Sequence, residues 1–175
     1  HRFDGQYGEL PAGYDHKYVY SHFGYNLKAT DMQAAVGCAQ IDKLNGFSEK
    51  RIENFNHLKQ ILLPVKNKII LPEKCHNSVP NWFGFIITCK DGTDRNKVVR
   101  YIENKNIQTR MLFAGNLTKH PCFDIMRKNG EGYRIAGNLT NTDLIMNKSF
   151  WVGVYPGMTY EMIEIIGAAI TEAVN

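Results

Sequence analysis

The stretch GYNLKATDMQAAVGCAQIDKL, residues 24–44, joins a polar loop to the start of a strongly marked helix. Thr30 can accept a backbone N–H as an N-cap residue, and Gln33 three positions later completes a capping box. We therefore predict a helix over residues 31–44. Its small residues cannot fill a core, so we expect them to allow close approach of another helix or a partner subunit; they are Ala34, Ala35 and Gly37.

A second helix is predicted directly after this one. Asn45-Gly46 reads as a C-terminal stop, and Ser48 can cap a helix that runs to Leu62 or Leu63, where Pro64 ends it. Its apolar residues recur at helical spacing and form one stripe: Ile52, Phe55, Leu58, Ile61 and Leu62. Such a helix is typical of a connector between two domains.

The rest of the chain alternates between strand and helix patterns, in the order β-β-α-β-α-α-β-α. We expect Trp82, Phe83 and Phe85 to lie in a buried strand. This alternation favours a sheet with helices on one face. The predicted strands cover 69–71, 82–89, 107–112 and 150–154, and the predicted helices cover 93–103 and 123–127 and begin near 141 and 159. Thr93 and Thr159 are the expected caps, and the apolar residues of the last helix are Met162, Ile165, Ile166 and Ile170.

Composition narrows the function classes. The 175 residues carry a net charge of +4 spread along the chain, without a basic stripe interleaved with exposed aromatics, which disfavours nucleic-acid binding. No apolar run approaches the roughly 20 residues of a membrane span, and no signal peptide is recognisable. We therefore expect no membrane association and a cytoplasmic location.

The four cysteines do not suggest a metal centre. They are Cys38, Cys75, Cys89 and Cys122, and no two of them form a C-x-x-C pair. Zinc sites and simple iron–sulfur loops use closer spacings. We predict free thiols.

Common catalytic signatures, such as G-x-S-x-G, H-E-x-x-H and phosphate-binding glycine loops, are absent from the sequence. Two clusters remain as candidates. His16 and His22 flank Tyr18 and Tyr20, which suits an acid or base beside a stacking surface, or simply structural hydrogen bonding. Arg110, Asn116, Lys119 and His120 surround a loop after a strand, which suits phosphate or sugar hydroxyls, or an ordinary surface loop.

Residues 24–44 and the helix after them resemble the pyridoxal-phosphate-dependent sugar aminotransferase and dehydrase family, DegT/DnrJ/EryC1/StrS. That family shares a G-x-N-x-[RK] loop, an A-A-x-G helix and a Q-[LI]-x-x-L ending. The matching residues are Asn26, Ala34, Ala35, Gly37, Gln40 and Leu44. Lys28-Ala29 stands where sugar aminotransferases commonly carry Arg-Met, which argues against an aminotransferase.

Longer motifs, spread over nearly the whole chain, resemble the branch of this family that acts on CDP-4-keto-6-deoxyglucose. They include GYDHKY at 13–18, NLKATD at 26–31, LFAGNLT at 112–118 and W-x-GVYPG at 151–157. The resemblance implies an α/β fold, the carboxy-terminal part of a fold-type-one transferase. Residues 1–46 would end the large cofactor-binding domain, 47–63 would form a connector helix, and 64–175 would form a small α/β domain.

The resemblance also implies a reaction. Pyridoxamine or pyridoxal phosphate would serve removal of the sugar's C3 hydroxyl, in the synthesis of 3,6-dideoxysugars for the O-antigen of lipopolysaccharide. A [2Fe-2S] cluster and an NADH-dependent iron–sulfur flavoprotein reductase would supply electrons to a homodimer. The catalytic histidine and the cluster cysteines would precede His1, so the fragment alone is expected to be inert.

By resemblance, Asn26 contacts the phosphate of the cofactor bound in the neighbouring subunit. Arg110, Asn116 and His120 would line the sugar-nucleotide side of the cleft, with His22 and Tyr25 close to it. Two other functions stay open: a nucleotide-sugar aminotransferase or cluster-free GDP-sugar 3-dehydratase of the same family, and a non-catalytic dimerisation or binding domain.

Overall fold

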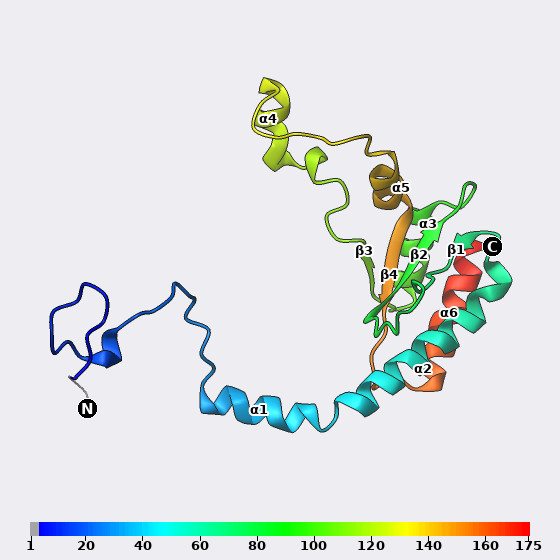
Figure 1. The fold of residues 1–175 in the computed structure, drawn as a ribbon. Helices are drawn as coiled ribbons and strands as arrows, with labels where there is room; N and C mark the ends of the chain where they lie inside the picture. Colours follow the sequence, from blue (N-terminus) through cyan, green and yellow to red (C-terminus); the bar gives the residue numbers. More distant parts are fainter. Residues whose placement is uncertain (1–3) are drawn as a thin grey trace. The chain divides into compact units, whose positions relative to one another are not determined.

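The computed structural model describes residues 4–175 and divides the chain into two units, His1–Gln40 and Ile41–Asn175. The first unit consists mostly of extended chain, with a 3₁₀ turn, η1 (His16–Tyr18), and most of helix α1 (Asp31–Ile41) (Figure 1). The expected capping box is confirmed: Thr30 N donates to Gln33 Oε1 at 2.9 Å, and Gln33 N donates to Thr30 Oγ1 at 3.3 Å. The sequence therefore located the start of α1 correctly.

The predicted break between the first two helices is displaced. Helix α2 spans Leu44–Leu62, so Asn45 and Gly46 lie in its first turn instead of ending α1. Amides in the first turn of a helix need no intrahelical partner, and a glycine there costs little. Ser48 does not cap α2, because it lies inside the helix, four residues after its first residue, and its hydroxyl accepts a hydrogen bond from Asn81 Nδ2 at 2.7 Å.

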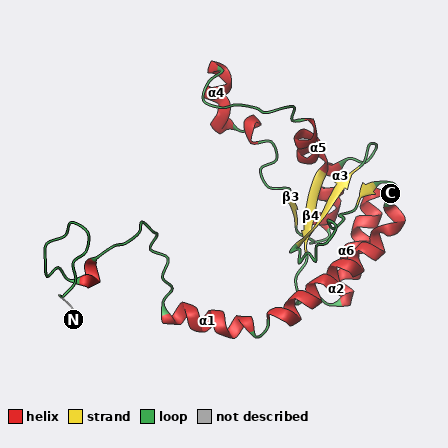
Figure 2. Ribbon diagram, viewed as in Figure 1, coloured by secondary structure: helices red, strands yellow, loops and turns green. Residues whose placement is uncertain are grey.

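The second unit contains an antiparallel sheet of four strands in the order β1-β2-β4-β3 (Figure 2). The strands follow the predicted order: β1 (Ile69–Ile70), β2 (Gly84–Cys89), β3 (Thr109–Met111) and β4 (Ser149–Gly153). The first three are shorter than predicted, and β4 has the predicted length but begins one residue earlier. The apolar pattern continues past each ladder, whereas backbone pairing stops where the neighbouring strand ends. Strand β3 forms one edge of the sheet.

The helices also follow the predicted order. They are α3 (Arg95–Asn104), α4 (Asp124–Asn129), α5 (Thr140–Lys148) and α6 (Tyr160–Val174), with 3₁₀ turns η2 (Leu63–Val65), η3 (Leu117–Lys119) and η4 (Pro121–Phe123). Thr159 caps α6 as expected, accepting from Met162 N at 3.2 Å. The cap of α3 is Asp94, one residue after the expected Thr93, because the Asp94 carboxylate accepts from two amides.

The core lies between one face of the sheet and helices α2, α3 and α6, which confirms the expected layering. Phe85 on β2 is fully buried, and its ring centroid lies 4.7 Å from that of Phe55 on α2. Helix α2 therefore contributes to the core of the second unit. The remaining buried apolar residues of this core include Leu58, Leu62, Ile87, Val98, Ile102, Phe150, Val152, Ile163 and Ile170.

The opposite face of the sheet, which we call the open face, carries Ile86, Trp151 and Phe83. Phe83 was expected to be buried but is 59% exposed. It lies on a bend just before Gly84, where the ladder with β4 begins, so strand alternation does not extend to it. Its ring instead meets the indole of Trp151 edge-on, with centroids 5.4 Å apart and planes at 89°.

Candidate functional site

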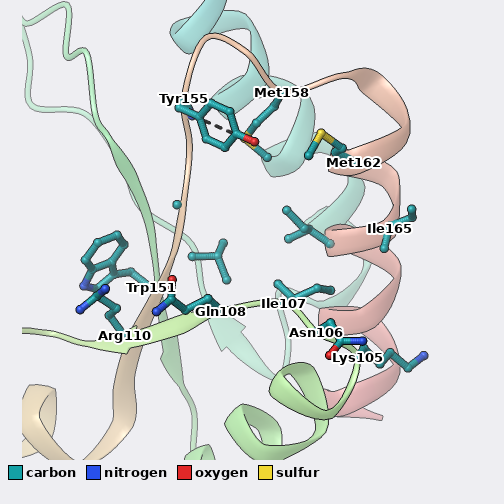
Figure 3. Close-up of a pocket in the computed structure, with 13 residues that line it drawn as sticks. Lys105, Asn106, Ile107, Gln108, Arg110, Trp151, Tyr155, Met158, Met162 and Ile165 are labelled. Atoms are coloured by element: carbon teal, nitrogen blue, oxygen red, sulfur yellow. Dashed lines mark hydrogen bonds between the residues drawn. The ribbon is translucent and has the colours of Figure 1, made fainter.

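A pocket of about 560 Å³ lies beside edge strand β3 in the second unit (Figure 3). Its walls come from the α3–β3 connection, from β4 and the loop after it, and from α6. The α6 wall is apolar, with Met162 43% and Ile165 53% exposed. The sequence analysis missed this wall, since Met162 and Ile165 read as part of the apolar face of an ordinary core helix.

Arg110 lies on β3 and lines this pocket. Its cross-strand partner is Trp151 on β4, and Figure 3 shows the two side chains beside each other, away from α6. Within residues 4–175 the Arg110 guanidinium has no hydrogen bond or ion pair with another side chain. An unpaired guanidinium at a pocket wall is suited to bind a phosphate or carboxylate with two parallel hydrogen bonds.

Asn116 is only 3% exposed and holds its loop together. Its Nδ2 donates to Asp143 Oδ1 at 2.7 Å, and its Oδ1 accepts from Thr118 N at 3.1 Å and from Thr118 Oγ1 at 2.6 Å. The bond from Asn116 and the nearby Lys119 ammonium lower the pKa of Asp143. The side chain therefore links the loop to α5, and its role toward substrate stays a prediction.

His120 is half-buried at the end of the same loop. Its Nε2 lies 2.7 Å from the carbonyl oxygen of Ala114, so this nitrogen carries the proton in the bond. Neither His120 nor Asn116 lines the pocket beside β3, whereas Arg110 does. The structure thus separates Arg110, which faces a cavity, from Asn116, which bonds to its own loop and to α5, and from His120, which bonds within its own loop.

The predicted residues of the first unit lie on the extended chain before α1. Tyr25 is 91% exposed, and His22 Nδ1 lies 3.0 Å from Ser21 Oγ. Asn26 is exposed, and its amide has no partner within the described residues. The exposed amide of Asn26 and the ammonium of Lys28 are chemically suited to hold a phosphate group.

The cysteines do not fit a metal cluster. Cys38, Cys75 and Cys122 are exposed, and burial raises the pKa of the Cys89 thiol to about 11. Among residues 4–175, no group of three or more histidine, cysteine or acidic side chains could hold a metal ion. Over the same residues, no helix is long and apolar enough to cross a membrane.

Comparison with known proteins gives a match over most of the chain. The sequence profile of the DegT/DnrJ/EryC1/StrS aminotransferase family matches residues 7–171. The lipopolysaccharide biosynthesis protein RfbH of Salmonella typhimurium is 49% identical over 173 residues, 98% of this chain and 38% of that protein. The dTDP-4-dehydro-2,6-dideoxy-D-glucose 3-dehydratase of Saccharopolyspora spinosa is 46% identical over 175 residues, 99% of this chain and 37% of that enzyme.

Solved structures agree on the fold. A GDP-4-keto-6-deoxymannose-3-dehydratase with a trapped PLP-glutamate geminal diamine aligns with a TM-score of 0.73 at 20% identity, over 88% of this chain and 39% of that one. A DegT/DnrJ/EryC1/StrS aminotransferase from Brucella abortus aligns with a TM-score of 0.73 at 14% identity, over 99% of this chain and 41% of that one. The chain thus has the α/β fold of part of these enzymes, and it spans less than two-fifths of the curated relatives described above.

Proposed function

Because the chain belongs to the DegT/DnrJ/EryC1/StrS aminotransferase family, we propose that it is part of a pyridoxamine-phosphate-dependent nucleotide-sugar 3-dehydratase. The observation that carries this proposal is 46% identity, over 99% of the chain, to a relative that is named as a 3-dehydratase of a nucleotide sugar. The substrate we favour is CDP-4-keto-6-deoxyglucose, whose C3 hydroxyl would be removed. The similarity to RfbH, a lipopolysaccharide biosynthesis protein, supports a role in O-antigen synthesis.

In this proposal the residues of the chain bind and orient, whereas the proton-transferring histidine lies outside it. The exposed amide of Asn26 donates to the phosphate of the cofactor in the neighbouring subunit, which makes the enzyme a homodimer. The guanidinium of Arg110 holds the anionic part of the nucleotide sugar. When bound, the cofactor supplies an electron sink for loss of the hydroxyl. Exposed residues of α1, including Gly37, are available for close subunit contact.

Electrons for this reaction would come from a [2Fe-2S] cluster and an NADH-dependent iron–sulfur flavoprotein reductase, in the cytoplasm. The cysteines of this chain do not fit a cluster, since one is buried with a raised pKa and no metal-binding group forms among the described residues. We therefore assign the cluster ligands to sequence outside this chain and derive no step from them.

The test is product analysis with the natural protein. It would be incubated with pyridoxamine phosphate, CDP-4-keto-6-deoxyglucose, NADH and an iron–sulfur flavoprotein reductase, and the sugar would be identified by mass spectrometry. We expect a sugar that lacks the C3 hydroxyl. The Asn26→Ala variant should need more cofactor for half-maximal activity, and Asn56→Ala on exposed α2 surface is the matched control.

The alternatives give different results in the same assay. An aminotransferase would form an amino sugar when glutamate is added and would not need the reductase. A cluster-free dehydratase would keep its activity after iron is removed. A binding domain would give no product with any donor, and its dimerisation would not respond to cofactor.

A further inference from the structure

The open face of the sheet places one cation directly beside one large aromatic ring. Arg110 and Trp151 are paired in the register of β3 and β4, and side chains at directly paired positions point to the same face about 5 Å apart. Arg110 has no charge partner among residues 4–175, and Figure 3 shows its guanidinium next to the indole. The pair therefore presents a positive charge and a π surface together.

The indole of Trp151 is held in one orientation by three contacts. Its Nε1 donates to the carbonyl oxygen of Met111 at 3.1 Å, and the ring of Phe83 meets it edge-on. Gly84, on the neighbouring strand, leaves the space that the ring occupies, because a Cβ there would lie 2.6 Å from Trp151 Cε3. A ring fixed in this way loses little conformational entropy when a ligand stacks on it.

The same pair borders a recess that is open to solvent. It measures about 620 Å³ and is lined by Thr109, Arg110, Met111, Phe113 and Trp151. This volume lies within the range of roughly 300–1,000 Å³ that is usual for small-molecule sites. Phe113 is 74% exposed and has a φ of +48°, a strained conformation for a bulky residue that is most often found at functional sites.

We propose that Trp151 is the stacking platform for the base of the bound nucleotide sugar, while Arg110 beside it binds the diphosphate. This inference rests on the proposed function and adds a specificity residue to it. Charge complementarity selects the occupant: an unpaired cation suits the diphosphate, and the fixed indole suits a planar base. Stacking tolerates any base, so Trp151 selects a nucleotide without selecting cytosine over thymine or guanine.

The test measures CDP and inorganic pyrophosphate binding to the natural protein by titration calorimetry. Trp151→Leu should weaken CDP binding by about 5- to 150-fold and leave pyrophosphate binding unchanged, since stacking contributes about 1–3 kcal/mol per base. Trp151→Phe keeps a ring and should restore most of the CDP affinity. Arg110→Gln should weaken both ligands, whereas Arg100→Gln, on the exposed surface of α3, should weaken neither.

A second measurement guards against loss of folding in Trp151→Leu. Protein labelled with 5-fluorotryptophan gives a fluorine resonance for each tryptophan, and the Trp151→Phe variant identifies the one from Trp151. That resonance should shift with CDP and not with pyrophosphate. An unshifted resonance would contradict stacking, whether or not the leucine variant folds.

The outcomes separate this inference from the proposed function. If the protein binds CDP and dehydrates its substrate while Trp151→Leu binds CDP like the wild type, stacking on Trp151 is wrong and the function stands. If Trp151→Leu weakens CDP and pyrophosphate equally, its role is structural and the inference fails. If CDP, dTDP and GDP all fail to bind the wild-type protein, both proposals fail.

Discussion

The two units of the chain differ in where their side chains find partners. From residue 4 to residue 40 no side chain is buried, and the side-chain hydrogen bonds of Gln6, His22 and Gln33 join residues at most four positions apart. In the second unit a continuous core links α2, α3, α6 and the sheet, and bonds such as that of Asn54 Nδ2 to Tyr155 O span more than a hundred residues.

This difference teaches how structural and binding roles are divided in the chain. Asn116 and His120 in the second unit were proposed from sequence as ligand contacts. Asn116 bonds to its own loop and to Asp143 on α5, and His120 bonds within its loop, whereas Arg110 has no side-chain partner among residues 4–175. In the first unit Asn26 and Tyr25 are exposed, as expected for residues that complete a site formed with other parts of the protein. Four predictions test this division.

The largest expected effect is on the core. Phe85→Ala should lower the free energy of unfolding by about 3–5 kcal/mol, because the ring is fully buried against Phe55. Leu27→Ala in the first unit, where the side chain is 83% exposed, should change it by less than about 0.5 kcal/mol. Urea unfolding followed by circular dichroism measures both, and a comparable loss in the two variants would contradict the division.

Replacing a glycine by alanine should lower the stability of the second unit but raise the stability of the helix in the first unit. Gly167→Ala on α6 should destabilise by about 1–3 kcal/mol, since a Cβ there would lie 2.5 Å from Ile61 Cγ2 on α2. Gly37→Ala on α1 meets nothing within 4 Å and should stabilise that helix by about 0.5–1 kcal/mol.

Urea unfolding reports the change at Gly167, and hydrogen exchange of the α1 amides reports the change at Gly37. In a homodimer that uses the small-residue face, Gly37→Ala should also weaken association, which sedimentation would detect. A stabilising Gly167→Ala would show that α2 and α6 are less closely packed than the structure has them.

Substitutions of two asparagines test whether a structural role and a binding role can be separated. Asn116→Ala should cost about 1–2 kcal/mol of stability, because it removes a cap and takes from the Asp143 carboxylate one of its two donors, leaving Lys119. Asn26→Ala should cost less than about 0.5 kcal/mol, yet weaken cofactor binding. Thermal unfolding and cofactor titration separate the two. A loss of cofactor affinity in Asn116→Ala with unchanged stability would show that Asn116 has a binding role and not a structural one.

The smallest expected effect is on how the stability of the second unit depends on pH. Hydrogen bonds from the Tyr160 hydroxyl and the Lys50 ammonium hold the pKa of Glu53 below its ordinary value of 4.5. Because the pKa is lower in the folded state, this contribution is present above pH 4.5 and is lost as the pH falls through the folded value. Unfolding of the second unit should therefore become easier below pH 4.5.

Glu53→Gln should flatten this dependence in urea titrations between pH 3 and 6. Asn56→Gln, a change of length without a change of charge on the exposed side of α2, should leave the slope intact. The group is exposed, so added salt should reduce the difference between wild type and variant. An unchanged slope in Glu53→Gln would assign the pH dependence to other carboxylates.

Local chemistry explains which structural predictions were confirmed. The Thr30–Gln33 capping box and the Thr159 cap depend on residues three positions apart, so the sequence alone reveals them. Two predictions were wrong: the helix end at Asn45-Gly46 and the burial of Phe83. Phe83 meets Trp151, a partner 68 positions away in the sequence that local patterns do not reveal, and α2 begins at Leu44, before the glycine that reads as a stop.

By itself, the sequence determined the family, the order of strands and helices, and the apolar stripe by which α2 enters the core. These follow from motifs, caps and apolar periodicity, which act over a few residues. Only the tertiary structure decided which polar residues are free to bind. Asn116 and Arg110 look alike in the sequence as ligand contacts. Folding brings Asp143 to the first, whereas the second has no side-chain partner among residues 4–175. Whether a side chain is committed or available depends on what the fold places beside it, and that is a property of long-range contacts.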